Sequence, residues 1–237
     1  ADGQTAGRRP PRRWRARVRR LPDTVSLPAA PGDDDRGPAG PSGAVALGVG
    51  GDDAGVVAVR VDAPVVVAGP PGSGRSAVLR TLARGLPGRC VVVASDHAAL
   101  RGLDAPLLGP GDGVDLARRL AADPATVVLV DDAVRLLDTP VEEVLLARAR
   151  RGPADGGGPL RLVATADGAE LAGSFRGLPA VLRTARTVLL LGRGGLVPAD
   201  LLGRRPLLSP AGGPGAGFLV VDGTWTALRT AGPEVLR

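Results

Sequence analysis

A glycine-rich loop is the part of the chain whose residue types and spacing most clearly suggest chemistry. Its spacing is that of a phosphate-binding loop, G-x-x-x-x-G-[K]-[ST], with Arg in place of the Lys. An apolar run precedes it and a helical pattern follows it, so the backbone amides and the helix start could hold a phosphate. With 36 Gly in the chain, a simple glycine-rich turn is the alternative interpretation. We expect nucleotide binding by the loop residues Gly69, Pro70, Pro71, Gly72, Ser73, Gly74, Arg75 and Ser76.

Two adjacent carboxylates follow a run of four apolar residues, 127–130. If that run is a strand, Asp131 and Asp132 lie at its carboxyl end, where ligands bind in open α/β sheets. The chemistry expected there is Mg²⁺ binding by Asp131 and the Ser76 hydroxyl, with ATP as the nucleotide. Asp132 occupies the place where a Glu often orients the attacking water, but its side chain is one methylene shorter. A helix N-cap is the alternative role for Asp132.

Polar residues at two further positions are weaker candidates. Thr165 ends the next apolar run, where a side chain can sense the γ-phosphate, although Thr165 or Asp167 could equally cap a helix. Arg183 and Arg186 lie near the end of a predicted helix. Compensation of the helix dipole is their ordinary role, and an arginine finger acting on a neighbouring module is the alternative.

Arg75 is the main departure from the phosphate-loop pattern. A Lys presents a compact ammonium to the β- and γ-phosphates, whereas the guanidinium is longer, planar and forked. Arg75 can still attract a polyphosphate, but it should misplace positive charge in the transition state. Because catalysis needs interactions specific to the transition state, we expect ATP binding to survive better than ATP hydrolysis.

The elements that must position these residues alternate along the chain. Continuous apolar runs, each followed by a helical pattern, predict a mostly parallel sheet covered by helices. Asp222 and Gly223 between two apolar runs predict a β-hairpin. The fold class is therefore α/β, a three-layer domain with a C-terminal β-hairpin. We expect strands over 57–61, 64–68, 90–94, 126–130, 160–164, 187–191, 217–221 and 224–228, and helices over 75–84, 114–122, 141–150 and 178–186.

Charge and composition divide the chain into two parts. Residues 1–20 hold eight Arg and one Asp, whereas the rest carries 22 Arg and 23 acidic residues, which argues against a broad DNA-binding face. We expect residues 1–44 to be a basic linker rich in Pro and Gly, with Trp14 anchoring it on a neighbouring module, and 45–237 to be the folded domain. Cys90 is expected in the core and His97 in a loop.

Several sequence features and amino-acid types are absent from the chain, and their absence indicates what kind of protein it is. The sequence has no apolar stretch of transmembrane length, and we expect no signal peptide. Its single Cys excludes a disulfide framework. Lys, Ile, Asn, Met and Tyr, which have AT-rich codons, are missing, which indicates a GC-rich genome such as an actinobacterial one. Because no Met is present, we expect Ala1 not to be a natural start and the chain to be part of a longer protein.

Taken in order, several segments resemble an FtsK/SpoIIIE-type ATPase module. The resemblance covers about residues 17–230 and is carried by the stretches 17–27, 45–61, 64–82, 175–191 and 215–223. It implies a RecA-like P-loop NTPase core in a multi-module motor. The greatest similarity is to type VII (ESX) secretion ATPases or actinobacterial FtsK/SpoIIIE-domain proteins. Arg75 and the Asp131–Asp132 pair fit a degenerate, C-terminal module of such a protein.

The function implied is that of an ATP-binding module of a translocation ATPase, with weak or no hydrolysis. Its partners would be sister ATPase modules of the same chain and oligomer, and secreted protein substrates. It would act on the cytoplasmic side of the membrane, which it would reach only through other parts of the protein. Two alternatives remain: a pseudo-ATPase that binds no nucleotide, and an active DNA-translocating ATPase that uses the Arg-rich segment.

Overall fold

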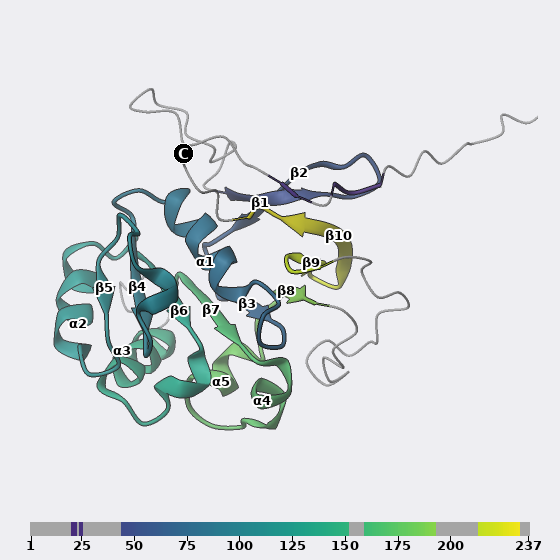
Figure 1. The fold of residues 1–237 in the computed structure, drawn as a ribbon. Coiled ribbons are helices and arrows are strands. Elements are labelled where there is room, and N and C mark those ends of the chain that lie inside the picture. The colour runs from purple at the N-terminus through teal and green to yellow at the C-terminus, as the bar shows by residue number, and fades with distance from the viewer. Residues whose placement is uncertain (1–19, 23, 26–43, 152–158, 193–212, 233–237) are drawn as a thin grey trace, which may run out of the picture.

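A single ten-stranded sheet organises the computed structural model, which describes residues 20–22, 24–25, 44–151, 159–192 and 213–232 (Figure 1). The strand order is β2-β1-β10-β9-β8-β3-β7-β6-β4-β5. The strands from β8 to β5 are parallel to one another, and those from β2 to β9 form an antiparallel extension. This is the mostly parallel α/β fold that the sequence predicts.

The parallel block carries the phosphate loop and both carboxylates. Its strands are β3 (Val65–Ala68), β4 (Cys90–Ala94), β5 (Leu107–Leu108), β6 (Val127–Asp131), β7 (Leu162–Ala166) and β8 (Thr187–Leu191). Its helices are α1 (Arg75–Arg84), α2 (Gly113–Ala122), α3 (Pro140–Arg150), α4 (Gly168–Gly173) and α5 (Gly177–Leu182). Short 3-10 helices, η1 (Ala98–Leu100) and η2 (Ala133–Leu136), follow β4 and β6.

The antiparallel extension joins segments from both ends of the described chain. Its strands are β1 (Ala44–Gly50), β2 (Gly55–Arg60), β9 (Ala216–Val221) and β10 (Thr224–Thr230). The predicted hairpin is confirmed: Asp222 and Gly223 have φ angles of 47° and 81°, which suit its tight turn. β9 pairs with β8, so the hairpin continues the parallel block directly.

The sheet separates two apolar clusters. Consecutive residues of β3 alternate between them, because side chains of a strand point to opposite faces: Val65 and Val67 lie in one cluster, Val66 and Ala68 in the other. Helix α1 packs on the first face, and α2 to α5 cover the other. The parallel strands are buried on both faces, which explains why their sequences are continuous apolar runs.

Several elements differ from the sequence prediction. β1 and β5 have no counterpart among the predicted elements, and α4 is anticipated only by the possible cap at Asp167. β1 contains two Gly, which weaken a strand signal, and the other two are short. The helix predicted over 178–186 ends at Leu182. There the Thr184 hydroxyl donates to the Val181 carbonyl (2.7 Å) in a turn that does not continue the helix. The other predicted elements are present with ends shifted by a few residues.

The predicted linker lies mostly outside the described residues, and so does Trp14. Of its described part, Val25 is buried and its carbonyl accepts a hydrogen bond from the Gly232 amide (3.0 Å), just after β10. None of the helices in the described ranges combines enough length with enough apolar character to cross a bilayer.

Candidate functional site

The phosphate loop connects β3 to α1 and is held by contacts to neighbouring strands. The Gly69 amide donates to the Ala166 carbonyl of β7 (3.2 Å), and the Ser73 amide turns back to the Pro70 carbonyl (3.2 Å). A Cβ on Gly69 would lie 2.5 Å from Ser73 Oγ and 2.8 Å from the Leu191 carbonyl oxygen. A side chain at position 69 would therefore push the loop off the edge of the sheet.

The antiparallel extension also supports the loop. The Gly215 amide, which directly precedes β9, donates to the Ser73 carbonyl (2.9 Å). Gly74 has φ 103° and is the N-cap of α1, and a Cβ there would approach the Gly215 amide nitrogen to 3.2 Å. The sequence analysis did not find this supporting role of Gly215, because 141 positions separate it from Gly74 and no local pattern marks it.

The N-terminus of α1, which follows the loop, is uncapped. It has no side-chain cap and no acidic residue in its first turn. Within the described ranges, no carbonyl accepts a hydrogen bond from the amides of Gly74, Arg75 or Ser76. Three uncapped amides at the positive end of a ten-residue helix form an arrangement that suits an anion such as a phosphate.

The Ser76 hydroxyl and the Asp131 carboxylate meet beside this helix start. Ser76 Oγ lies 3.1 Å from Asp131 Oδ2 and 3.3 Å from Oδ1, although 55 positions separate the two residues. The Thr165 hydroxyl, from the neighbouring strand β7, donates to Asp131 Oδ1 (2.8 Å). A hydroxyl and a carboxylate together supply the hard oxygen ligands that Mg²⁺ prefers.

Thr165 links the Asp131 carboxylate to the backbone of Asp132. Besides its contact with Asp131, its Oγ1 accepts a hydrogen bond from the Asp132 amide (2.8 Å) and is fully buried. The helix-capping role considered for Thr165 is not observed, and its role toward a γ-phosphate stays a prediction. Asp167 caps α4 instead, accepting from the amides of Ala169 (2.8 Å) and Glu170 (3.4 Å).

Asp132 is held in an unusual backbone conformation at the tip of β6. Its φ of 60° and ψ of 73° are left-handed. It stands at the start of η2, but its side chain makes no capping bond. Its Oδ2 instead forms an ion pair with Nε of Arg135 (2.9 Å), a residue that the sequence analysis missed. Its Oδ1 is buried without a hydrogen-bond partner in the described part of the chain.

Unpaired polar atoms concentrate in this region. Among the described residues, five buried side-chain atoms lack a hydrogen-bond partner, and three of them belong to Ser73, Arg75 and Asp132. Buried polar atoms in folded proteins are nearly always hydrogen-bonded, so orphaned ones need an explanation. A polar ligand with its own donors and acceptors is one. The residues present therefore fit a nucleotide with its Mg²⁺.

The predicted arginine fingers have partners away from the phosphate loop. Arg183 Nη1 donates to the Ala172 carbonyl (2.6 Å), and its guanidinium lies 4.3 Å from the centre of the Phe175 ring. Arg186 Nη1 is 3.6 Å from an oxygen of Asp222 in the hairpin turn. These contacts connect the end of α5 to α4 and the segment after it, and the start of β8 to the hairpin turn. A role of either Arg toward a neighbouring module stays a prediction.

Cys90 and His97 lie where the sequence predicts. Cys90 is buried at the start of β4, and burial raises the pKa of its thiol from 9.0 to about 11. His97 lies in the loop before η1. The described residues contain no group of three or more His, Cys, Asp or Glu that could bind a metal ion by themselves. A Mg²⁺ held by Ser76 and Asp131 would therefore need phosphate or water oxygens as further ligands.

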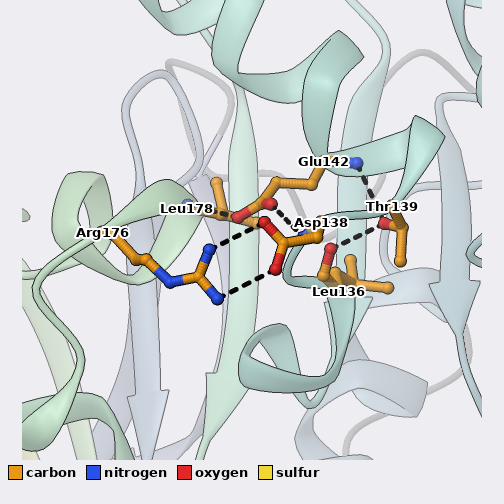
Figure 2. Close-up of polar contacts among 6 residues, drawn as sticks. All are labelled: Leu136, Asp138, Thr139, Glu142, Arg176 and Leu178. Carbon is orange, nitrogen blue, oxygen red and sulfur yellow. Dashed lines mark hydrogen bonds and ion pairs between the residues drawn. The ribbon is translucent and has the colours of Figure 1, made fainter.

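A second polar cluster lies around the start of α3, beyond η2. Glu142 of α3 is buried, and its carboxylate accepts from the amides of Asp138 (2.7 Å) and Leu178 (2.7 Å), as Figure 2 shows. The exposed carboxylate of Asp138 binds Arg176 through two hydrogen bonds of 2.8 and 2.9 Å, and this contact lowers the pKa of Asp138. Gly177, with φ 62°, leaves no space for a Cβ because Glu142 Oε1 lies against it.

Solved structures provide the comparison for this geometry. The sequence matches no family model and no curated protein. The fold is similar to the cytoplasmic domain of EssC, with a TM-score of 0.67, 16% identity, and coverage of 91% of this chain and 48% of that chain. It is also similar to the cytoplasmic domain of the Thermomonospora curvata type VII secretion ATPase EccC, with a TM-score of 0.62, 18% identity, and coverage of 91% and 29%.

A third similar structure is that of a conjugation coupling protein. The pCW3 conjugation coupling protein TcpA, solved as a monomer with ATPγS, has a TM-score of 0.64 at 14% identity, with 91% of this chain and 71% of that chain covered. The chain spans less than half the length of the EssC and EccC chains that it matches. At these identities the likeness establishes the fold. The chain therefore has the α/β, RecA-like fold shared by EssC, EccC and TcpA.

Proposed function

We propose that the chain is an ATP-binding module of a translocation ATPase, with slow hydrolysis. One observation carries the proposal: Ser76 and Asp131 meet at the open N-terminus of α1. A phosphate loop without that contact would be only a glycine-rich turn. The contact places a hydroxyl and a carboxylate, the two side-chain types needed for Mg²⁺, beside uncapped amides that suit a phosphate.

Each residue near the helix start has a role in this proposal. The loop backbone, residues 69–76, would hold the phosphates, and Arg75 would add positive charge. Ser76 and Asp131 would hold Mg²⁺, with Thr165 fixing the orientation of the Asp131 carboxylate through its 2.8 Å hydrogen bond. When bound, Mg²⁺ would neutralise charge on the phosphates. Asp132 would accept a hydrogen bond from the attacking water.

Two features support slow hydrolysis. Arg75 replaces the compact ammonium with a larger forked group, so charge is less well placed for the transition state than for the bound ground state. Asp132 is shorter than a Glu, and one oxygen of its carboxylate is already engaged by Arg135. Both features weaken transition-state interactions while leaving the phosphate-binding amides of α1 intact.

The larger setting follows from the similar structures and is also a proposal. Structures of EssC from Geobacillus thermodenitrificans and of Thermomonospora curvata EccC each comprise ATPases 2 and 3, and the EccC structure is a complex with a signal sequence peptide. We infer that this chain works beside sister ATPase modules, at the cytoplasmic side of the cell membrane, on a translocated protein substrate. The nearly balanced charge of residues 21–237 gives no support to DNA as that substrate.

Calorimetry with a non-hydrolysable ATP analogue tests the proposal. We expect binding that requires Mg²⁺, and a loss of about tenfold in affinity for Ser76→Ala, because one proposed oxygen ligand of Mg²⁺ is removed. Ser95→Ala, at an exposed Ser after β4, is the matched control and should bind normally. Absence of both heat and thermal stabilisation in the unaltered chain would refute the proposal and favour a nucleotide-free interaction module.

A further inference from the structure

The ion pair between Asp132 and Arg135 occupies the carboxylate that the proposed reaction needs. Oδ2 of Asp132 is bound to Nε of Arg135 at 2.9 Å. Oδ1 is buried from solvent and has no partner among the described residues. In this arrangement Oδ1 is unpaired but shielded from solvent and Oδ2 is already paired, so a water molecule does not reach the carboxylate unless the side chain rotates. The carboxylate must turn or leave Arg135 before it can accept a hydrogen bond from water.

The surrounding structure keeps this pair in place. The Thr165 hydroxyl holds the Asp132 amide (2.8 Å), and the Arg135 amide donates to the Asp132 carbonyl (3.0 Å). Ala133 and Leu136 of η2 are fully buried and fix the turn between the two charged residues. The backbone on both sides is thus rigid, so the ion pair can release only through side-chain rotation.

Arg135 itself is accessible. Its side chain is 67% exposed, whereas that of Asp132 is only 22% exposed. An exposed ion pair is weak and is screened by salt, so it can be displaced by a competing anion. The ion pair between Arg135 and Asp132 can therefore break and re-form, as a regulatory contact must, whereas a structural contact stays formed.

We propose that Arg135 is a positioning residue that restrains ATP hydrolysis by holding the Asp132 carboxylate away from the attacking water. This inference rests on the proposed ATPase function and deepens it. Removing the guanidinium frees Oδ2, so the chemical step accelerates while phosphate binding by the α1 amides is unchanged. Because exposed pairs contribute little, the expected increase in kcat is about two- to fivefold.

The test compares Arg135→Gln with a matched control. Arg118 forms an ion pair of the same spacing, with Asp115 three positions away (3.0 Å), on α2, and there both side chains are exposed. We expect Arg135→Gln to raise kcat, to leave the Kd of a non-hydrolysable Mg–ATP analogue within about twofold, and to lose the gain when combined with Asp132→Ala. Arg118→Gln should change none of these quantities.

A binding measurement gives a second readout. The affinity of Mg–ADP with aluminium fluoride, which mimics the transition state, should rise in Arg135→Gln relative to that of Mg–ADP alone, by the same factor as kcat. If turnover in Arg135→Gln is unchanged, lower or undetectable while the analogue still binds, Arg135 does not restrain hydrolysis and the inference is wrong. Absence of analogue binding in both the unaltered chain and the variant refutes the proposed function instead.

Discussion

Two polar clusters, one on either side of η2, differ in how completely their side-chain atoms are hydrogen-bonded. The site cluster, made of Ser76, Asp131, Asp132, Arg135 and Thr165, contains a buried carboxylate oxygen without a partner beside a helix start with free amides. The Glu142 cluster, made of Asp138, Thr139, Glu142, Arg176 and Leu178, leaves no buried atom unpaired among the described residues (Figure 2).

The difference separates a candidate binding site from a structural contact. Both clusters contain carboxylates, a Thr hydroxyl and an Arg, so residue types alone do not distinguish them. Glu142 already accepts two amide hydrogen bonds and joins the start of α3 to α5. A satisfied network stabilises the fold, whereas unsatisfied groups retain capacity for a ligand. Substitutions in the two clusters should accordingly affect different measurements.

The largest expected effect is on stability and comes from Glu142→Gln. The amide that replaces one carboxylate oxygen would face a backbone N–H, so one charge-assisted hydrogen bond is lost and a buried donor is left unpaired. We expect the free energy of unfolding to fall by about 3 kcal/mol in chemical denaturation. Binding of the ATP analogue should stay unchanged at temperatures where the variant is folded.

Glu143→Gln is the control for this prediction. Glu143 is the neighbouring residue in the same first turn of α3, but its side chain is exposed. Its substitution should change the free energy of unfolding by no more than about 0.5 kcal/mol. Equal effects of the two substitutions would show that Glu142 contributes only helix-dipole charge.

The next effect concerns the site cluster and the reaction. Arg75→Lys restores the compact ammonium, and we expect turnover to rise by about tenfold, equivalent to about 1.4 kcal/mol of barrier, with a smaller change in ATP affinity. Arg84→Lys, at the exposed last turn of α1, is the control. If Arg75→Lys has no effect and Asp132→Glu alone raises turnover, the defect lies at the attacking water.

The smallest effect belongs to the exposed edge of the Glu142 cluster. Asp138 has φ 60°, which Asn also tolerates, so Asp138→Asn removes the charge without new backbone strain. We expect the Tm to fall by less than about 2 °C, because the pair with Arg176 is exposed and screened by salt.

This small difference should depend on pH in a defined direction. Arg176 lowers the pKa of Asp138 below its ordinary value of 3.8. The stabilisation from a lowered carboxyl pKa is present above that value and is lost as the pH falls through the folded-state pKa. The Tm values of the unaltered chain and Asp138→Asn should therefore converge in acid. A Tm difference that persists there would assign the effect to something other than charge.

The sequence predicts well the residues whose placement depends only on their neighbours in the chain. The phosphate loop is contiguous, and Asp131 directly follows a buried strand, so their placement needs only the rule that ligands gather at the carboxyl ends of parallel strands. The hairpin at Asp222 and Gly223 is equally local. The predicted roles of these residues toward ATP and Mg²⁺ remain predictions.

What the sequence does not show depends on pairings between distant residues. Arg135 engages Asp132 only because η2 turns back after β6. Thr165 reaches the Asp131 carboxylate and the Asp132 amide only because β7 lies beside β6. The extension formed by β1, β2, β9 and β10 joins strands more than 150 positions apart.

The sequence by itself thus determined a glycine-rich loop with the spacing of a phosphate loop, its following helix, a strand with two terminal carboxylates and an α/β fold. The tertiary structure alone decided which hydroxyl meets Asp131, which cation occupies Asp132, and which carboxylate is fully satisfied. The physical reason is that backbone propensity and hydrophobic periodicity act over a few residues. Hydrogen-bond satisfaction is instead settled by whichever groups the folded chain brings within about 3 Å of each other.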